Sequence, residues 1–151
     1  GVVPGIKKLT AEGIPVRLAV SLHAPSDELR DELVPMNKRF NTTQVLDAAH
    51  DYWLASKRRV SIEYALMRGI NDQAEHAQLL AKRLNHYGDN WAHVNPIPLN
   101  PIEGSKWTAS KPEDEQWFLE ILHRAGITAT LRDTRGQDID GACGQLAAKE
   151  R

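Results

Sequence analysis

The sequence predicts an α/β protein whose parallel strands are joined by crossover helices. Two observations favour this class. Four short segments have the composition and alternation of β-strands. The segments between them are long and periodic enough to form helices that cross from one strand to the next. The 151 residues contain no internal repeat and no low-complexity segment, so we expect one domain, for which ~100–200 residues is typical.

The first half of the chain is expected to hold two strands and two helices. Residues 16–22 alternate with period two and predict a strand, as do residues 60–66. Ser26 is expected to cap a short helix over 27–34, and Asn41 a longer helix over 42–56. The apolar residues of the longer helix fall on one stripe: Val45, Leu46, Ala49, Tyr52 and Trp53.

Two further helices and two further strands are expected in the second half. Asp72 with Glu75 predicts a capping box for a helix that Gly88 ends, and Ser110 with Glu113 predicts another, with Pro112 in its first turn. Residues 91–98 predict a third strand, whose two prolines favour an edge or a strand end. Residues 127–132 predict the fourth strand, after Gly126, and residues 134–145 a polar loop. The inward residues expected of the two helices are Ala77, Leu80, Ala81 and Leu84, then Trp117, Leu119 or Phe118, Ile121 and Leu122.

One face of the first three predicted strands is dotted with polar residues. A sheet covered by helices on both faces would leave such groups buried and unpaired, at ~1–3 kcal/mol each. A barrel or partial barrel with a ligand in its lumen accommodates them, and so does a sheet with one wetted face. The two interpretations overlap, because a partial barrel has a wetted inner face. The polar sets are Arg17, Ser21 and His23; Ser61 and Glu63; and His93 and Asn95.

The composition excludes several classes of protein. Lys and Arg number 19 against 20 Asp and Glu, a net charge of −1, so a nucleic-acid partner would need a local patch. No apolar run reaches the roughly 18 residues of a membrane helix, and no secretory signal is present, so we expect a cytoplasmic protein without membrane contact. One cysteine excludes an internal disulfide framework and a multi-cysteine metal site within the chain.

Both ends of the sequence suggest a piece of a longer protein. The chain starts without methionine inside an apolar run, and residues 147–151 have the character of a starting helix. We therefore expect an active site that residues elsewhere complete. A deliberately trimmed chain is the simpler alternative.

Three places offer residues for chemistry. Parallel strands bind ligands at their carboxyl ends, and these ends hold Ser21 and His23, which lie two apart and should point the same way, and Asn100. Each of these alone is more often a turn or loop residue. Cys143 lies among small residues in a polar loop, as a thiol that approaches another molecule would, although most lone cysteines are inert. No nearby His and no G-x-S-x-G elbow support a hydrolase. The run 57–59 is either a solvated turn or a phosphate contact.

Four segments, in this order, resemble the C-terminal half of the RlmN-type ribosomal RNA adenine-C2 methyltransferases, which are radical S-adenosylmethionine enzymes. They are LAVSLHAP at 18–25 with DELRDELVP at 27–35; IEY at 62–64; NPIPLNP at 95–101; and TRG at 134–136 with DIDGACGQL at 138–146. The match covers nearly the whole chain, and its first and last segments are highly specific.

The resemblance implies a partial (βα)6 radical-SAM barrel of which residues 1–151 form the second half, with a methyl-carrier cysteine loop at 134–146. It implies that Ser21, Leu22, His23 and Asn100 contact S-adenosylmethionine and that Cys143 carries the methyl group. In this family the cysteine thiolate takes a methyl from one S-adenosylmethionine. A radical made from a second one at a 4Fe–4S cluster abstracts hydrogen from the methylated cysteine, and the resulting carbon radical adds to adenine. A second cysteine then resolves the adduct through a disulfide.

The implied partners are 23S rRNA, transfer RNA as a further candidate substrate, and an electron donor for the cluster. Radical chemistry suits adenine C2, which is electron-poor and cannot attack a sulfonium. The family's three-cysteine cluster motif, resolving cysteine and acidic base have no counterpart in the chain, and no residue of it is assigned as a metal ligand. The isolated chain is therefore expected to be inactive and to bind S-adenosylmethionine weakly or not at all.

Three alternatives stay open at this point. A sister class that methylates adenine C8 and confers antibiotic resistance shares much of the pattern. An RNA-binding module without chemistry would have no need of a thiol in a glycine-flanked loop. A non-radical α/β enzyme would use Ser21 and His23 and would work without iron or reductant.

Overall fold

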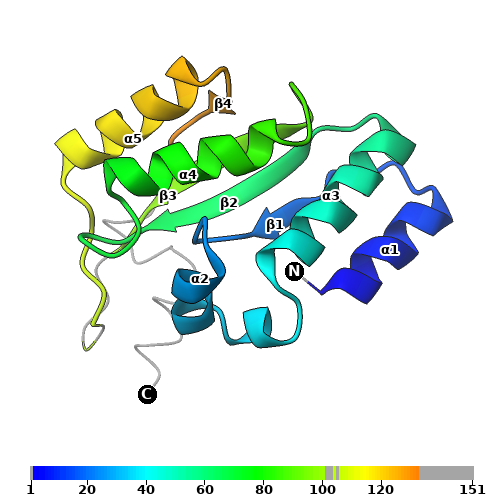
Figure 1. Cartoon of the computed structure of the whole chain (residues 1–151), viewed down its shortest axis with the longest axis horizontal. Helices are drawn as coiled ribbons and strands as arrows, with labels where there is room; N and C mark the ends of the chain where they lie inside the picture. Colours follow the sequence, from blue (N-terminus) through cyan, green and yellow to red (C-terminus); the bar gives the residue numbers. More distant parts are fainter. Residues whose placement is uncertain (1, 101–103, 105, 133–151) are drawn as a thin grey trace.

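Four parallel strands form one sheet in the order β1-β2-β3-β4 (Figure 1). The computed structural model describes residues 2–100, 104 and 106–132. The strands are β1 (Ala19–Ser21), β2 (Val60–Leu66), β3 (Ala92–Pro98) and β4 (Thr128–Ala129). Sequential strands pair with their neighbours, and helices cross over between them, so the predicted α/β class with a parallel sheet is confirmed.

The helices form the layer that buries the sheet. They are α1 (Val3–Glu12), α2 (Asp27–Leu33), the 3-10 helix η1 (Pro35–Lys38), α3 (Thr42–Ser56), α4 (Ala74–Asn85) and α5 (Pro112–Arg124). Helix α1 packs on α3, and α4 packs on α5. The predicted stripe of α3 is buried except for the partly exposed Trp53, and the predicted inward residues of α4 are all buried.

The sheet has one apolar face and one polar face. In β2 the residues Val60, Ile62, Tyr64 and Leu66 are fully buried and join the helices in the core. The side chains between them belong to the opposite face, because side chains alternate along a strand. That face carries the predicted polar set, and its polar groups bond to one another. This arrangement fits an inner face of a partial barrel.

Two predicted helix starts are confirmed. The Oδ1 atom of Asn41 accepts a hydrogen bond from the Gln44 amide at 2.9 Å, and the Gln44 side chain accepts one from the Asn41 amide at 2.9 Å. At α2, Ser26 Oγ accepts from the Leu29 amide at 3.4 Å. Such a cap contributes typically ~1 kcal/mol, so local sequence fixes where these two helices begin.

Two other predicted capping boxes are wrong for a shared reason. Ser110 Oγ donates to Asp72 Oδ2 at 2.6 Å, and both residues are buried. Helix α4 begins one residue later than predicted, with His76 Nδ1 accepting from the Gln73 amide at 3.1 Å. Helix α5 has no side-chain cap, although its first-turn proline is as predicted. Both predicted capping groups therefore bond to each other in the tertiary structure, and neither caps a helix.

Other differences concern short or terminal elements. The sequence did not predict α1. Strands β1 and β4 are shorter than the predicted 16–22 and 127–132. Strand β3 lies inside the sheet rather than at its edge, but Pro96 and Pro98 fall beyond the two residues that pair with β4, so they mark a strand end. Trp117 is 44% exposed rather than buried, with the Arg124 guanidinium 5.2 Å from its ring centre.

Candidate functional site

The turn after β1 carries three of the predicted binding residues. Strand β1 ends at Ser21, which is exposed, and Leu22 is 1% exposed. His23 is half-buried and has a positive φ of 62°, a left-handed conformation that is uncommon outside glycine. Ser21 and His23 therefore do not lie on one strand, and the prediction that strand alternation aligns them is wrong.

A buried arginine holds this turn from behind. Arg30 is 0% exposed, and its Nη2 and Nε atoms donate to the carbonyl oxygens of Ser21 and Leu22 at 3.0 and 2.9 Å. Its Nη1 atom donates to Asn37 Oδ1 at 2.9 Å. Burial lowers the pKa of Arg30, and the nearby charge of Asp27 opposes that shift. The planar fork of a guanidinium suits this set of acceptors, which a single ammonium could not match.

A buried asparagine completes the support. Asn71 is 0% exposed, and its Nδ2 atom donates to the carbonyl oxygens of His23 and Ala65 at 2.8 and 2.7 Å. Its Oδ1 atom accepts from the Met67 amide at 2.8 Å. Arg30 and Asn71 together engage the carbonyls of three successive residues, Ser21, Leu22 and His23. The turn is thus fixed before any ligand arrives, which reduces the entropy that binding must offset.

The hydrogen bonds also define the protonation of His23. The Ala65 amide donates to His23 Nδ1 at 2.9 Å. An accepting Nδ1 requires the neutral ring with its proton on Nε2. Burial, and then the charge of Arg30, lower the pKa of His23. No partner of Nε2 is recorded among the described residues, so the N–H group there is available to a ligand acceptor.

The lowered pKa of His23 predicts a loss of stability in mild acid. As pH falls below 6.5, the ordinary pKa of an unfolded histidine, the unfolded chain takes up a proton that folded His23 does not accept. The free energy of unfolding then falls by at most about 1.4 kcal/mol per pH unit from this residue. We expect urea titrations at pH 7.5 and 5.5 to show this loss, and the variant His23→Asn, which tolerates a positive φ, to show less of it.

A matched variant isolates the effect of His23. The pKa values of His76 and His93 are also lowered, first by burial, so the wild-type chain loses stability from all three. His76→Asn/His93→Asn removes the other two imidazoles and keeps His23, so it should retain the part of the loss that His23→Asn removes. Equal slopes for His23→Asn and the wild type would contradict the assignment.

Asn100 comes from the neighbouring part of the same sheet edge. It follows β3, and β3 and β1 flank β2 in the sheet. Its Oδ1 atom is buried and has no hydrogen-bond partner among the described residues. An unpaired buried acceptor costs ~1–3 kcal/mol, which a ligand N–H or O–H would recover. The donors of Ser21 and His23 and the acceptor of Asn100 therefore fit a polar ligand at the carboxyl edge.

The polar face of the sheet is organised around Glu63. Its carboxylate accepts from Ser61 Oγ at 3.0 Å, from Asn95 Nδ2 at 3.3 Å and from Arg132 Nη2 at 2.9 Å. Asn95 also donates to Ser61. These contacts link β2, β3 and the residues after β4, so the groups predicted from alternation do meet on one face.

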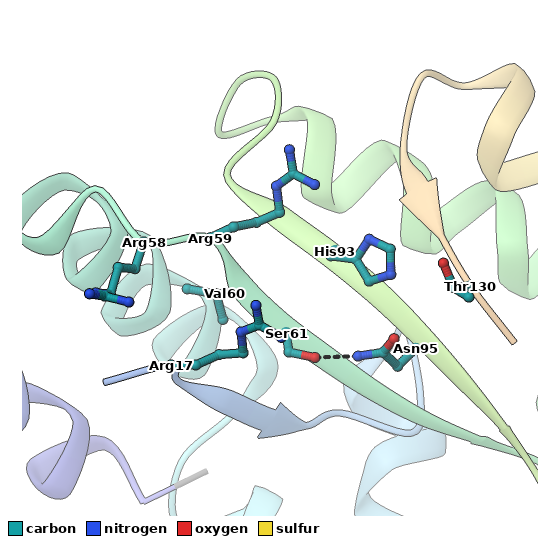
Figure 2. A pocket seen from close by; sticks show the side chains of 8 residues that line it. All are labelled: Arg17, Arg58, Arg59, Val60, Ser61, His93, Asn95 and Thr130. Carbon is teal, nitrogen blue, oxygen red and sulfur yellow. Dashed lines mark hydrogen bonds between the residues drawn. The ribbon is translucent and has the colours of Figure 1, made fainter. Parts of the chain in front are cut away.

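A hollow of about 560 Å³ lies next to this network, at the amino ends of the strands (Figure 2). Arg17, Arg58, Arg59 and His93 line it together with neutral polar groups of Ser61, Asn95 and Thr130. The run 57–59, predicted as either a turn or a phosphate contact, thus contributes two arginines to a concave surface.

Cys143 and the loop 134–146 lie outside the described residues. Among the residues that the structure describes, no group of three or more His, Cys, Asp or Glu could hold a metal ion. The whole chain has one cysteine, whereas a 4Fe–4S cluster needs several thiolate ligands. The chain's residues therefore do not fit such a cluster. None of the helices in the described part is long and apolar enough to cross a membrane.

Comparison with known proteins identifies the relatives of the chain. Over all 151 residues it is 99% identical to a protein of Bifidobacterium longum and 93% identical to one of Bifidobacterium adolescentis, both named probable dual-specificity RNA methyltransferase RlmN. The chain is a segment of an RlmN-type protein. It spans 39% of the length of each of these relatives. No family model matches the chain.

Solved structures agree with the RlmN-type assignment. A radical SAM methyltransferase from Sphaerobacter thermophilus is similar with a TM-score of 0.89 and 44% identity, over 96% of this chain and 42% of that one. A domain of pyruvate-formate lyase-activating enzyme from Bacteroides vulgatus shares the fold, with a TM-score of 0.62 and 15% identity. The sheet and its helices are thus part of a radical-SAM barrel, as the resemblance implied.

Two residues of the site were not predicted from the sequence. Arg30 lies in a run of charged residues, DELRDEL, where nothing separates it from a solvated arginine. Asn71 lies in a turn after β2, where asparagine is common for local reasons. Their importance comes from contacts with the turn after β1, which no local pattern shows.

Proposed function

We propose that the longer RlmN-type protein methylates RNA by radical S-adenosylmethionine chemistry and that this chain supplies part of the cofactor site and the methyl carrier. The target is C2 of an adenine in 23S rRNA, with transfer RNA as a second substrate, in the cytoplasm. The supporting observation is the fixed turn of Ser21, Leu22 and His23 at the same edge of the sheet as the unpaired acceptor of Asn100, within a chain 99% identical to a relative named as an RNA methyltransferase.

The described residues would hold S-adenosylmethionine by complementary hydrogen bonding. The Ser21 hydroxyl and the Nε2–H of His23 can donate to its carboxylate, ribose or adenine acceptors. Asn100 Oδ1 can accept from its amino or hydroxyl groups. Leu22 offers no free backbone group, because its amide donates to the Glu63 carbonyl and its carbonyl accepts from Arg30. Its role would be to keep the turn anchored in the core.

Cys143 is proposed to accept and then deliver the carbon. The Cys143 thiolate would attack the methyl carbon of S-adenosylmethionine and form an S–C bond, while the bond from that carbon to the sulfonium sulfur breaks and S-adenosylhomocysteine leaves as a neutral thioether. Its neighbours in the sequence, Gly141, Ala142 and Gly144, are small residues, which suits a group that meets both a cofactor and RNA. The ligands of the 4Fe–4S cluster, the resolving cysteine and the acidic base are assigned to the rest of the longer protein.

Mass spectrometry tests the methyl-carrier role. In the longer protein purified from cells, we expect the peptide that contains Cys143 to be heavier by about 14 Da, the mass of one CH₂. A Cys143→Ala variant should lose that increment and all RNA methylation. Because it keeps the turn after β1, its affinity for S-adenosylmethionine should remain close to that of the wild type. Active protein in which Cys143 is only a free thiol would refute the role.

The same preparation tests the target position. Nuclease digestion of RNA treated with the active protein, followed by chromatography of the nucleosides, should yield 2-methyladenosine. Recovery of 8-methyladenosine instead would refute the C2 assignment and leave the carrier role standing.

A further inference from the structure

The basic hollow at the amino ends of the strands has no part in the cofactor site described above. Arg17 precedes β1, Arg58 and Arg59 precede β2, and His93 is the second residue of β3. The turn after β1 and Asn100 lie at the opposite, carboxyl ends. Since β2 has seven residues, the two edges are ~20 Å apart.

Three arginines line the hollow, and its described lining residues include no acid. All three arginines are exposed, and the structure records no ion pair for any of them within its described residues. Within the described part of the chain, Arg59 donates one side-chain hydrogen bond, to Thr128 Oγ1 at 3.4 Å. The acid on this face, Glu63, is bound by Arg132 at 2.9 Å and by Ser61 and Asn95. Glu63 is therefore paired with Arg132, while its carboxylate also lies close enough to affect His93 in the hollow.

Two of the arginines, Arg17 and Arg59, act on the same part of the hollow. Burial, followed by the charges of Arg59 and Arg17, lowers the pKa of His93. Both guanidinium groups therefore act on the same imidazole from different connecting segments, and the charge of Glu63 opposes them. Figure 2 shows Arg17 and Arg59 near the first residues of β2 and β3, while Arg58 points away from Ser61 and Asn95.

We propose that this hollow binds the phosphodiester backbone of the RNA substrate. Guanidinium groups match phosphate oxygens bidentately, and three of them line this hollow. The chain carries a net charge of −1, so attraction of a polyanion has to come from a local surface of this kind. The proposal rests on the proposed function for the identity of the polyanion as RNA.

Such a site would position RNA rather than read its sequence. Phosphate contacts fix the register of a nucleic acid on a protein and carry no direct base information. A contact ~20 Å from the cofactor site would hold the flanking strand while the target base reaches the carboxyl edge. It would also be shared by different RNA substrates.

The test measures RNA binding by the full 151-residue chain. Binding is monitored by the fluorescence anisotropy of a labelled single-stranded RNA. The variant Arg17→Gln/Arg58→Gln/Arg59→Gln is expected to bind RNA at least about tenfold more weakly. A plot of the logarithm of its binding constant against the logarithm of the salt concentration should be less steep by about 2, because three phosphate contacts are lost. The control Lys7→Gln/Lys8→Gln/Lys38→Gln removes the same charge from exposed positions on α1 and η1 and should bind like the wild type. Circular dichroism checks that all variants fold.

Three results would overturn the proposal. Equal weakening by the two triple variants would show attraction without a site. Binding of inorganic phosphate in the hollow, seen as shifts of the Ser61 and His93 amide resonances, with no binding of RNA, would show a small-anion site. Tighter binding of a glutamate-rich peptide than of RNA would indicate a protein partner. Methylation of Cys143 is measured separately, so it can persist when this inference fails.

Discussion

Replacement of Arg30 by methionine is expected to lower the free energy of unfolding by about 3–5 kcal/mol. Methionine fills similar space but donates no hydrogen bond. The carbonyls of Ser21 and Leu22 and the Oδ1 atom of Asn37 would each lose a partner at a site that is 0% exposed. Urea denaturation of the 151-residue chain measures the change.

A surface arginine provides the matched control for Arg30. Arg124 is exposed and pairs with Glu120 at 2.8 Å on α5, so Arg124→Met should change stability by no more than about 0.5 kcal/mol. Arg30→Lys keeps the charge, and its loss of stability should lie between those of Arg30→Met and Arg124→Met, because one ammonium cannot reach the same acceptors. A loss of less than about 1 kcal/mol for Arg30→Met would show that the turn does not depend on this side chain.

Asn71→Asp is expected to cost about 2–4 kcal/mol, although it exchanges a single nitrogen for oxygen. The amide Nδ2 atom donates to two carbonyls, those of His23 and Ala65. A carboxylate would place acceptors against acceptors in a fully buried position. In the longer protein, the affinity for S-adenosylmethionine should fall as well, because the His23 end of the turn is released.

An Asn→Asp exchange at an exposed position separates the effect of the changed side chain from the effect of burial. Asn85 is exposed and donates from Nδ2 to the Ala125 carbonyl at 2.9 Å. Asn85→Asp should cost less than about 1 kcal/mol. Equal stability of Asn71→Asp and Asn85→Asp would contradict the claim that burial makes the amide of Asn71 necessary. Thermal unfolding of both variants at pH 7.5 provides the comparison.

The sequence predicts the parts of this fold that are locally determined. The bounds of α3 and β2 follow from the Asn41 cap and from alternation along 60–66, and the structure has the same bounds. The polar face was predicted because Ser61, Glu63 and Asn95 interrupt apolar strands at period two. In each case the cause lies within a few residues of its effect.

The missed features depend on contacts between distant segments. Asp72 and Ser110 resemble helix caps, but they bond to each other across 38 positions of sequence. His23 departs from the strand because its ring accepts the Ala65 amide and its carbonyl accepts Asn71. Trp117 stays near the surface because Phe118, one position along, is the residue that α5 buries. The role proposed for Cys143 comes from the resemblance and stays a prediction.

The lengths of the strands affect how the molecule behaves when it is concentrated. Strands β2 and β3 have seven residues each and lie in the interior of the sheet, while the flanking β1 and β4 have three and two. A flanking strand that short presents few unpaired amides and carbonyls to another copy. Residues 61–63 of β2 and 93–94 of β3 are paired on both sides, so these residues offer no free sheet edge to another copy.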